Sequence, residues 1–140
     1  LSSSSVKFVG TCTIGTDHID QVYLQQRDIG FSAAPGCNAN AVVDYVISSL
    51  IVLAQQQGFD LFERCVGVIG VGNVGSRLKA RLGALGIRCL CTDPLHDDQQ
   101  SRGLAPLDQL LAEADILSLH TPLTFEGEHA MCGSMSRRLI

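Results

Sequence analysis

The chain has 140 residues, of which 46% are hydrophobic and 17% charged, and its formal net charge is −4. These values are typical of a globular chain long enough for one compact domain. The acidic balance, without a long basic cluster, disfavours nucleic acid as a partner. The longest apolar run, 41–54, is interrupted by Asp44, Ser48 and Ser49, so we expect no membrane partner.

The six cysteines show neither disulfide nor metal-ligand spacing. Cys89 and Cys91 lie two apart on an expected strand, so they share a face without the further ligands that a metal needs. We therefore expect no metal site, and reduced thiols in a cytoplasmic protein.

The first segment is expected to form a strand over Val6–Val9, a loop over 10–20 and a helix near Asp20–Arg27. Glycines flank Thr13, which makes its backbone N–H and hydroxyl candidates for binding an anion. The alternative is an ordinary strand-to-helix turn with Asp17 as the N-cap.

A turn and short strand over 28–32 follow, and 33–36 breaks that strand. A long helix is expected from after Asn38 to about Gln57, ended by Gly58. Its apolar positions cover much of the helix circumference, which is typical of a helix buried between two layers or two domains.

Three glycines then lie between an apolar strand over 66–69 and a helix. This order of strand, Gly70-x-Gly72-x-x-Gly75 and helix is typical of a dinucleotide-binding turn. Gly70 allows the sharp turn, Gly72 lets a diphosphate approach the backbone, and Gly75 lets the helix pack on the strand. The N–H groups of the first helical turn would face the phosphates.

A second strand is expected over Ile87–Thr92, and it ends in Asp93, 18 positions after Gly75. A carboxylate at this spacing accepts hydrogen bonds from the adenosine ribose and repels a 2′-phosphate, which favours NAD over NADP. The alternative is a tight turn that binds nothing. The ribose carboxylate disfavours a third interpretation, a methyltransferase with a similar glycine loop.

A polar loop over 97–103, a short helix over 105–111 and a third parallel strand over 114–119 complete the pattern. The expected fold is therefore α/β, a partial Rossmann-type doubly wound parallel sheet. Thr121 lies just beyond the third strand, where residues line the ligand crevice. His18 and His120 are interpreted as scaffold histidines, because neither has an evident carboxylate partner for general-base work. His96 and His129 are expected in loops.

The order of segments resembles the D-2-hydroxyacid dehydrogenase family. The stretches that carry the resemblance are 6–11, 15–18, 31–39, 68–78, Asp93-Pro94 and 120–123. Together they cover roughly Val6 to His129.

The resemblance implies NAD-dependent oxidation of a small phosphorylated 2-hydroxy acid to the 2-oxo acid, and a homodimer in full-length members. It also implies that Thr13 contacts substrate and that Asn73, Val74, Asp93 and Thr121 contact NAD. The domains implied are 1–36, a fragment of the substrate domain; 37–129, a partial NAD-binding domain with an interdomain helix; and 130–140, a divergent tail.

The family's catalytic Arg, Glu and His would come from segments beyond this chain, so no catalytic residue is assigned. We expect the chain to be truncated, frame-shifted or a fragment. The alternative function is accordingly an inactive NAD-binding remnant, or a different D-2-hydroxyacid dehydrogenase.

Overall fold

The computed structural model describes residues 4–13, 15–93 and 103–121. They divide into two compact units, residues 1–40 and 41–140, each of which is described by itself. The expected loop 97–103 lies almost wholly outside the described residues, as do His96, His129, Cys132 and the tail 130–140.

The first unit is a small parallel strand–helix–strand unit: β1 (Phe8–Thr11), α1 (Gln21–Gln26) and β2 (Gly30–Ala33). The expectation that Asp17 is the N-cap is wrong. Asp20 caps α1, because its Oδ1 atom accepts a hydrogen bond from the Tyr23 N–H at 2.9 Å. Strand β1 begins two residues later than expected, since the register with β2 sets its limits.

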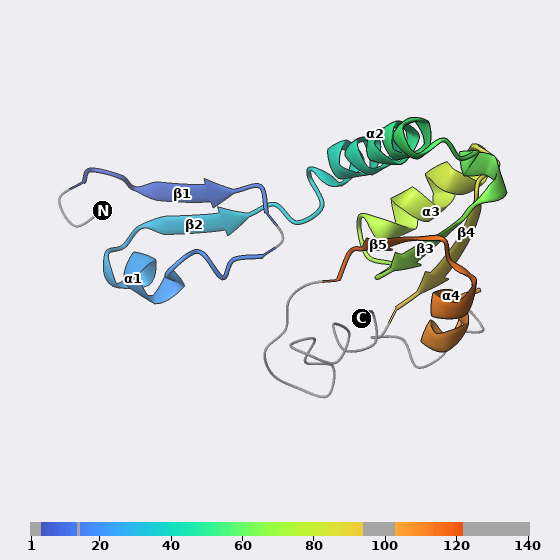
Figure 1. The fold of residues 1–140 in the computed structure, drawn as a ribbon. Helices are drawn as coiled ribbons and strands as arrows, with labels where there is room; N and C mark the ends of the chain where they lie inside the picture. The colour runs from blue at the N-terminus through green and yellow to red at the C-terminus, as the bar shows by residue number, and fades with distance from the viewer. Residues whose placement is uncertain (1–3, 14, 94–102, 122–140) are drawn as a thin grey trace. The chain divides into compact units, whose positions relative to one another are not determined.

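The second unit contains a three-stranded parallel sheet with helices on both faces (Figure 1). Its strands β3 (Cys65–Ile69), β4 (Arg88–Thr92) and β5 (Ile116–Leu119) lie in the order β4-β3-β5. The other elements are α2 (Ala39–Gln57), η1 (Leu61–Glu63), α3 (Gly75–Ala84) and α4 (Leu107–Glu113). The predicted doubly wound parallel arrangement is therefore confirmed.

The core of this unit lies on both faces of β3, whose five residues are all buried. On one face, Val66 and Val68 pack with Leu78 and Leu82 of α3 and with Leu50 of α2. On the other face, Ile69 packs with Leu110 of α4. A parallel strand covered on both faces reads as a continuous apolar run, and the run before the glycines fits this pattern.

The expectation that α2 is buried over much of its circumference is wrong for the described part of the chain. One side, including Val43 and Leu50, packs in the core, whereas Tyr45 is 73% exposed and Ile51 49% exposed. This helix is long and apolar enough to cross a membrane by length and composition, although a globular core helix meets the same test. Its interrupting residue Asp44 forms an ion pair with Arg81 of α3 at 3.0 Å.

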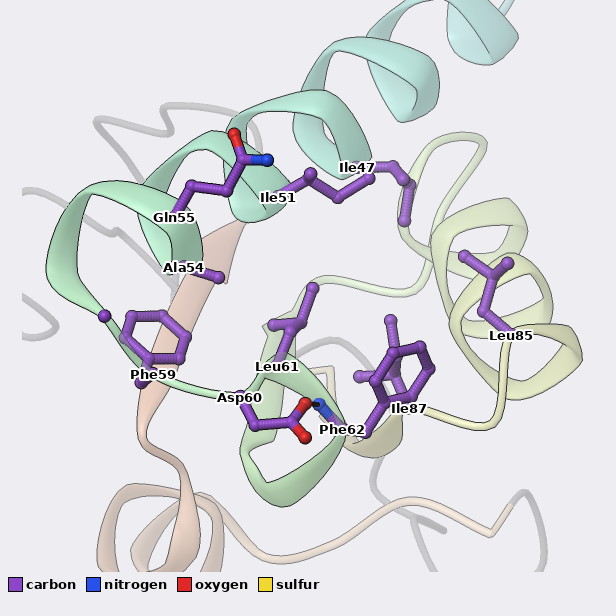
Figure 2. A pocket seen from close by; sticks show the side chains of 11 residues that line it. Ile47, Ile51, Ala54, Gln55, Phe59, Asp60, Leu61, Phe62, Leu85 and Ile87 are labelled. Carbon is purple, nitrogen blue, oxygen red and sulfur yellow. Dashed lines mark hydrogen bonds between the residues drawn. The ribbon is translucent and has the colours of Figure 1, made fainter.

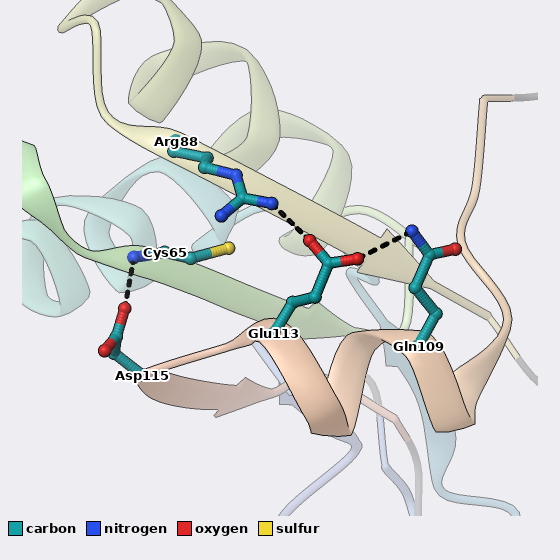
Figure 3. Close-up of polar contacts among 5 residues, drawn as sticks. All are labelled: Cys65, Arg88, Gln109, Glu113 and Asp115. Atoms are coloured by element: carbon teal, nitrogen blue, oxygen red, sulfur yellow. Dashed lines mark hydrogen bonds and ion pairs between the residues drawn. The ribbon is translucent and has the colours of Figure 1, made fainter.

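Hydrogen bonds and ion pairs link residues at the amino ends of the strands (Figure 3). Asp115, just before β5, accepts the Cys65 N–H at 2.8 Å and forms an ion pair with Arg64 at 3.1 Å. Glu113 at the end of α4 pairs with Arg88 and accepts from Gln109. These contacts hold the pairing of β5 and α4 with the rest of the sheet.

Candidate functional site

The three glycines form a tight turn between β3 and α3, and each has a different steric environment. Gly70 has φ +93°, and an added Cβ would lie 2.8 Å from the main chain of His120. An added Cβ at Gly72 meets nothing within 4 Å, whereas one at Gly75 would lie 1.9 Å from the Gly70 carbonyl oxygen. The sharp turn at Gly70 and the close packing at Gly75 are therefore as expected, whereas the approach of a diphosphate to Gly72 stays a prediction.

The end of β4 contacts the start of this glycine turn. The Gly70 N–H donates to the Thr92 carbonyl at 2.8 Å, which extends the β3–β4 ladder by one bond. The next amide, Val71 N–H, donates to Asp93 Oδ2 at 2.7 Å. Asp93 is 6% exposed, and this hydrogen bond places its carboxylate directly beside the turn. The contact with the adenosine ribose that its spacing indicates stays a prediction.

The end of β5 closes the other side of Gly70. The His120 N–H donates to the Ile69 carbonyl at 2.7 Å. The Thr121 Cγ2 atom would lie 2.8 Å from a Cβ added at Gly70. Gly70, Asp93 and Thr121 therefore come together at the carboxyl ends of three neighbouring strands, where ligands bind in open α/β sheets.

The turn leads into the amino end of α3, where Val74 is the N-cap residue and makes no side-chain capping bond. Val74 packs against the core and Asn73 is exposed. Ser76 Oγ donates to the Gly72 carbonyl at 2.7 Å, and the Arg77 guanidinium donates to the Asn73 carbonyl. A helix amino end with a cationic side chain beside it is a favourable environment for a diphosphate.

Thr13 lies in the first unit, on an exposed loop after β1. Its hydroxyl donates to the Gly15 carbonyl at 2.7 Å, and its N–H donates to Thr11 Oγ1 at 3.3 Å. Both donors that the sequence offers to an anion are thus used inside the loop. An anion there would have to replace these bonds.

The structure describes the surroundings of two histidines, His18 and His120. His120 Nε2 lies 2.9 Å from Ser118 Oγ, and burial lowers the pKa of this imidazole. His18 is exposed in the loop that precedes α1. Within the described residues, no three His, Cys, Asp or Glu side chains are grouped as a metal site requires.

Cys89 and Cys91 point to the same face of β4, as predicted, with their Sγ atoms 3.5 Å apart. The hydrogen bond to Cys91 raises the pKa of the Cys89 thiol, and burial raises it further. The same bond lowers the pKa of the Cys91 thiol, and both side chains pack in the core cluster of the second unit.

A cavity of about 640 Å³ lies away from the glycine turn, between the end of α2, η1 and the α3–β4 connection (Figure 2). Its lining is mainly apolar and includes Ile51, Leu61, Phe62, Leu85 and Ile87. Leu61 and Ile87 precede β3 and β4, so the cavity is at the amino ends of the strands. It is therefore no part of the crevice at the carboxyl ends.

Two features escaped prediction from the sequence: this cavity and the hydrogen bond from Val71 to Asp93. The cavity depends on the relative positions of α2, η1 and α3, which the periodicity of apolar residues does not predict. One feature of the sequence could have predicted the hydrogen bond from Val71 to Asp93. Asp93 directly follows a strand that pairs with β3, so its side chain lies level with the turn after β3.

A parallel α/β sheet with this glycine turn and a buried carboxylate on the adjacent strand defines a dinucleotide-binding unit. The model of the D-isomer specific 2-hydroxyacid dehydrogenase NAD-binding domain matches residues 48–136. The chain belongs to this family of NAD-dependent dehydrogenases and carries its NAD-binding domain. The matched range includes residues 130–136 of the tail.

Similar proteins agree with this assignment. Erythronate-4-phosphate dehydrogenase of Citrobacter koseri is 58% identical over 130 residues, which cover 92% of this chain and 34% of that protein. The protein of the same name from Escherichia coli K12 is 53% identical over 141 residues, covering 100% of this chain and 37% of that protein. The chain thus spans about a third of the length of these curated relatives.

Solved structures share the fold. D-lactate dehydrogenase from Aquifex aeolicus, complexed with NAD and lactic acid, has a TM-score of 0.63 and 27% identity, covering 96% of this chain and 46% of that one. The apo-structure of D-lactate dehydrogenase from Escherichia coli has a TM-score of 0.70 at 23% identity, covering 85% of this chain and 44% of that one.

Proposed function

We propose that this chain is the NAD-binding part of an enzyme that oxidises 4-phospho-D-erythronate at C2 to the 2-oxo acid, a step of pyridoxine synthesis. The glycine turn beside buried Asp93 carries the cofactor half of the proposal. The substrate half is supported by relatives at 53% and 58% identity that are named for this substrate.

Each site residue has a proposed role. Gly72, Asn73, Val74 and the amino end of α3 hold the diphosphate, while Gly70 and Gly75 shape the turn. Asp93 binds the adenosine ribose and excludes a 2′-phosphate, and Thr121 lines the cofactor side of the crevice. NAD supplies the hydride acceptor when it is bound.

The remaining parts of the proposal concern substrate and assembly. Thr13 contacts the substrate through the loop after β1, and the catalytic Arg, Glu and His roles of the family are assigned to no residue of this sequence. Residues 1–36 belong to the substrate domain, and 37–129 to the NAD-binding domain. We also propose a homodimer, a cytoplasmic location, and no nucleic-acid or membrane partner.

A second candidate is an NAD-binding chain without turnover. The observation that favours it is the coverage of only 34% and 37% of the relatives' lengths. The two candidates differ in whether the 140 residues alone reduce NAD in the presence of 4-phospho-D-erythronate.

The test combines a fluorescence titration with NADH and an absorbance assay of NADH formation from NAD and 4-phospho-D-erythronate. Saturable binding with turnover supports the enzyme, and saturable binding alone supports the second candidate. A folded sample that shows no saturable binding would overturn both. The matched variant is Gly72→Val, because a Cβ added at this position meets nothing within 4 Å in the protein. We expect it to keep the stability of the parent chain and to lose NADH binding.

A further inference from the structure

The first two amides of the glycine turn are already engaged by the protein. Gly70 N–H bonds to the Thr92 carbonyl at 2.8 Å, and Val71 N–H bonds to Asp93 Oδ2 at 2.7 Å. These amides face β4 and not a ligand. The Ser76 N–H in the first turn of α3 also donates to the Gly72 carbonyl, at 3.1 Å. The main-chain donors for a diphosphate must therefore come from residues 72–75.

The second of these bonds depends on one side chain. A main-chain carbonyl remains under any substitution, but the acceptor for Val71 disappears if Asp93 is truncated. The acceptor in this bond is a carboxylate that is 6% exposed. Hydrogen bonds to charged groups in buried surroundings are stronger than hydrogen bonds between neutral groups.

The direction of the Val71 amide follows from the turn at Gly70. With φ at +93°, the chain leaves the β3 ladder and presents the next N–H to the end of β4. The main chain of His120 occupies the opposite side of Gly70. The turn is thus fixed by β5 on one side and by Asp93 on the other.

We propose that Asp93 is a positioning residue for the glycine turn in addition to its ribose contact. This proposal rests on the proposed NAD site. It holds that the Asp93–Val71 bond keeps the turn in the conformation that places the later amides around a diphosphate. Removing the carboxylate should then weaken the binding of every dinucleotide, including one that carries a 2′-phosphate.

Two substitutions separate positioning from ribose recognition. Asp93→Asn removes the charge that repels a 2′-phosphate and keeps an oxygen that can accept from Val71. Asp93→Ala removes both the charge and the acceptor. If Asp93 acted only on the ribose, the Val71 amide would exchange equally fast in the two variants.

The experiment uses the full 140-residue chain and measures amide hydrogen exchange without ligand, and dissociation constants for NADH and NADPH by fluorescence titration. We expect Asp93→Ala to exchange the Val71 amide more than about tenfold faster than the parent, since the loss of a hydrogen bond to a charged group corresponds to at least that factor. We expect Asp93→Asn to keep most of the protection, to narrow the gap between NADH and NADPH, and to bind both more tightly than Asp93→Ala.

Asp115→Ala is the control, because it removes a similar carboxylate-to-amide bond at the amino end of β3. It should speed exchange at Cys65 and leave the NADH affinity unchanged. Unchanged Val71 exchange in Asp93→Ala, or equal NADPH binding by the two Asp93 variants, would overturn the positioning role. If no variant and not even the parent binds NADH, the NAD proposal fails. The exchange data would still decide whether Asp93 holds the turn.

Discussion

Two parallel strand–helix–strand units of the chain, β1–α1–β2 and β3–α3–β4, differ greatly in how much apolar surface they bury. In the first, no strand residue is buried, and Leu24 and Ile29 are the buried apolar side chains near its helix. In the second, all of β3 is buried, and Leu78 and Leu82 of α3 are fully inaccessible.

This difference shows that a shared topology does not confer a shared stability. Burial contributes about 25 cal/mol per Å² of apolar surface, so the second unit has by far the larger driving force. The α1 helix has 6 residues against 10 for α3, and short helices gain little stability by themselves. The second unit should therefore hold its structure independently of the first.

The largest expected effect comes from truncating a core leucine in each unit. Leu78→Ala, at a side chain with 0% exposure, should lower the free energy of unfolding by about 2–5 kcal/mol, because it leaves a cavity in close packing. Leu24→Ala in α1 should leave the main urea transition within about 0.5 kcal/mol of the parent. Equal losses in urea denaturation would show that the two units unfold as one.

The next effect concerns the glycine turn of the second unit. Gly75→Ala places a Cβ 1.9 Å from the Gly70 carbonyl oxygen, so we expect a loss of about 1–3 kcal/mol from overpacking and loss of NADH binding. Gly83→Ala in the same helix meets nothing within 4 Å and should be neutral or stabilising by up to about 1 kcal/mol. Thermal unfolding and NADH titration of both variants give the comparison. A Gly75→Ala variant as stable as Gly83→Ala would contradict the tight turn.

The smallest effect is a pH dependence of the second unit. The bond from the Cys65 amide lowers the pKa of Asp115, with help from Arg64, and the Gln109 and Arg88 side chains lower the pKa of Glu113. Carboxyls whose pKa is lower when folded contribute stability above their ordinary values of 3.8 and 4.5. That contribution is lost as the pH falls through the lower folded values.

His120 adds a second pH range, at higher pH, in which stability depends on pH. Burial lowers the pKa of its imidazole below the ordinary 6.5, so the unfolded chain binds its proton first and stability declines as the pH drops below that value. Urea midpoints measured from pH 7 downward should show both declines, and Asp115→Asn should flatten only the more acidic one. Stability that rises on acidification would contradict both signs.

The strongest parts of the fold were predictable because several local signals agreed. The apolar run before Gly70, the three glycines and Asp93 indicated the strand–turn–helix–strand order, and Gly58, with φ +72°, follows α2 as expected. The exposure of α2 was not predictable, because periodicity marks an apolar side chain without revealing whether any neighbour covers it. The N-cap of α1 was missed, since Asp17 and Asp20 carry the same capping signal.

The candidate site was predictable in its residue types but not in its connections. Spacing located Asp93 and Thr121 near the turn, and the structure brings both to Gly70. Spacing did not show that Thr13 uses its hydroxyl and amide inside its own loop. Such bonds depend on backbone direction in a turn, which sequence alone specifies weakly.

The apolar cavity near Leu61 and Phe62 and the glycine turn lie at opposite ends of β3. Five residues in a strand separate them by about 13 Å. Changes this far apart generally combine additively to within about 0.5 kcal/mol. Substitutions that fill the cavity with larger apolar side chains can therefore be used to raise the stability of the protein, and they can be combined with independent substitutions at the glycine turn that change the cofactor preference.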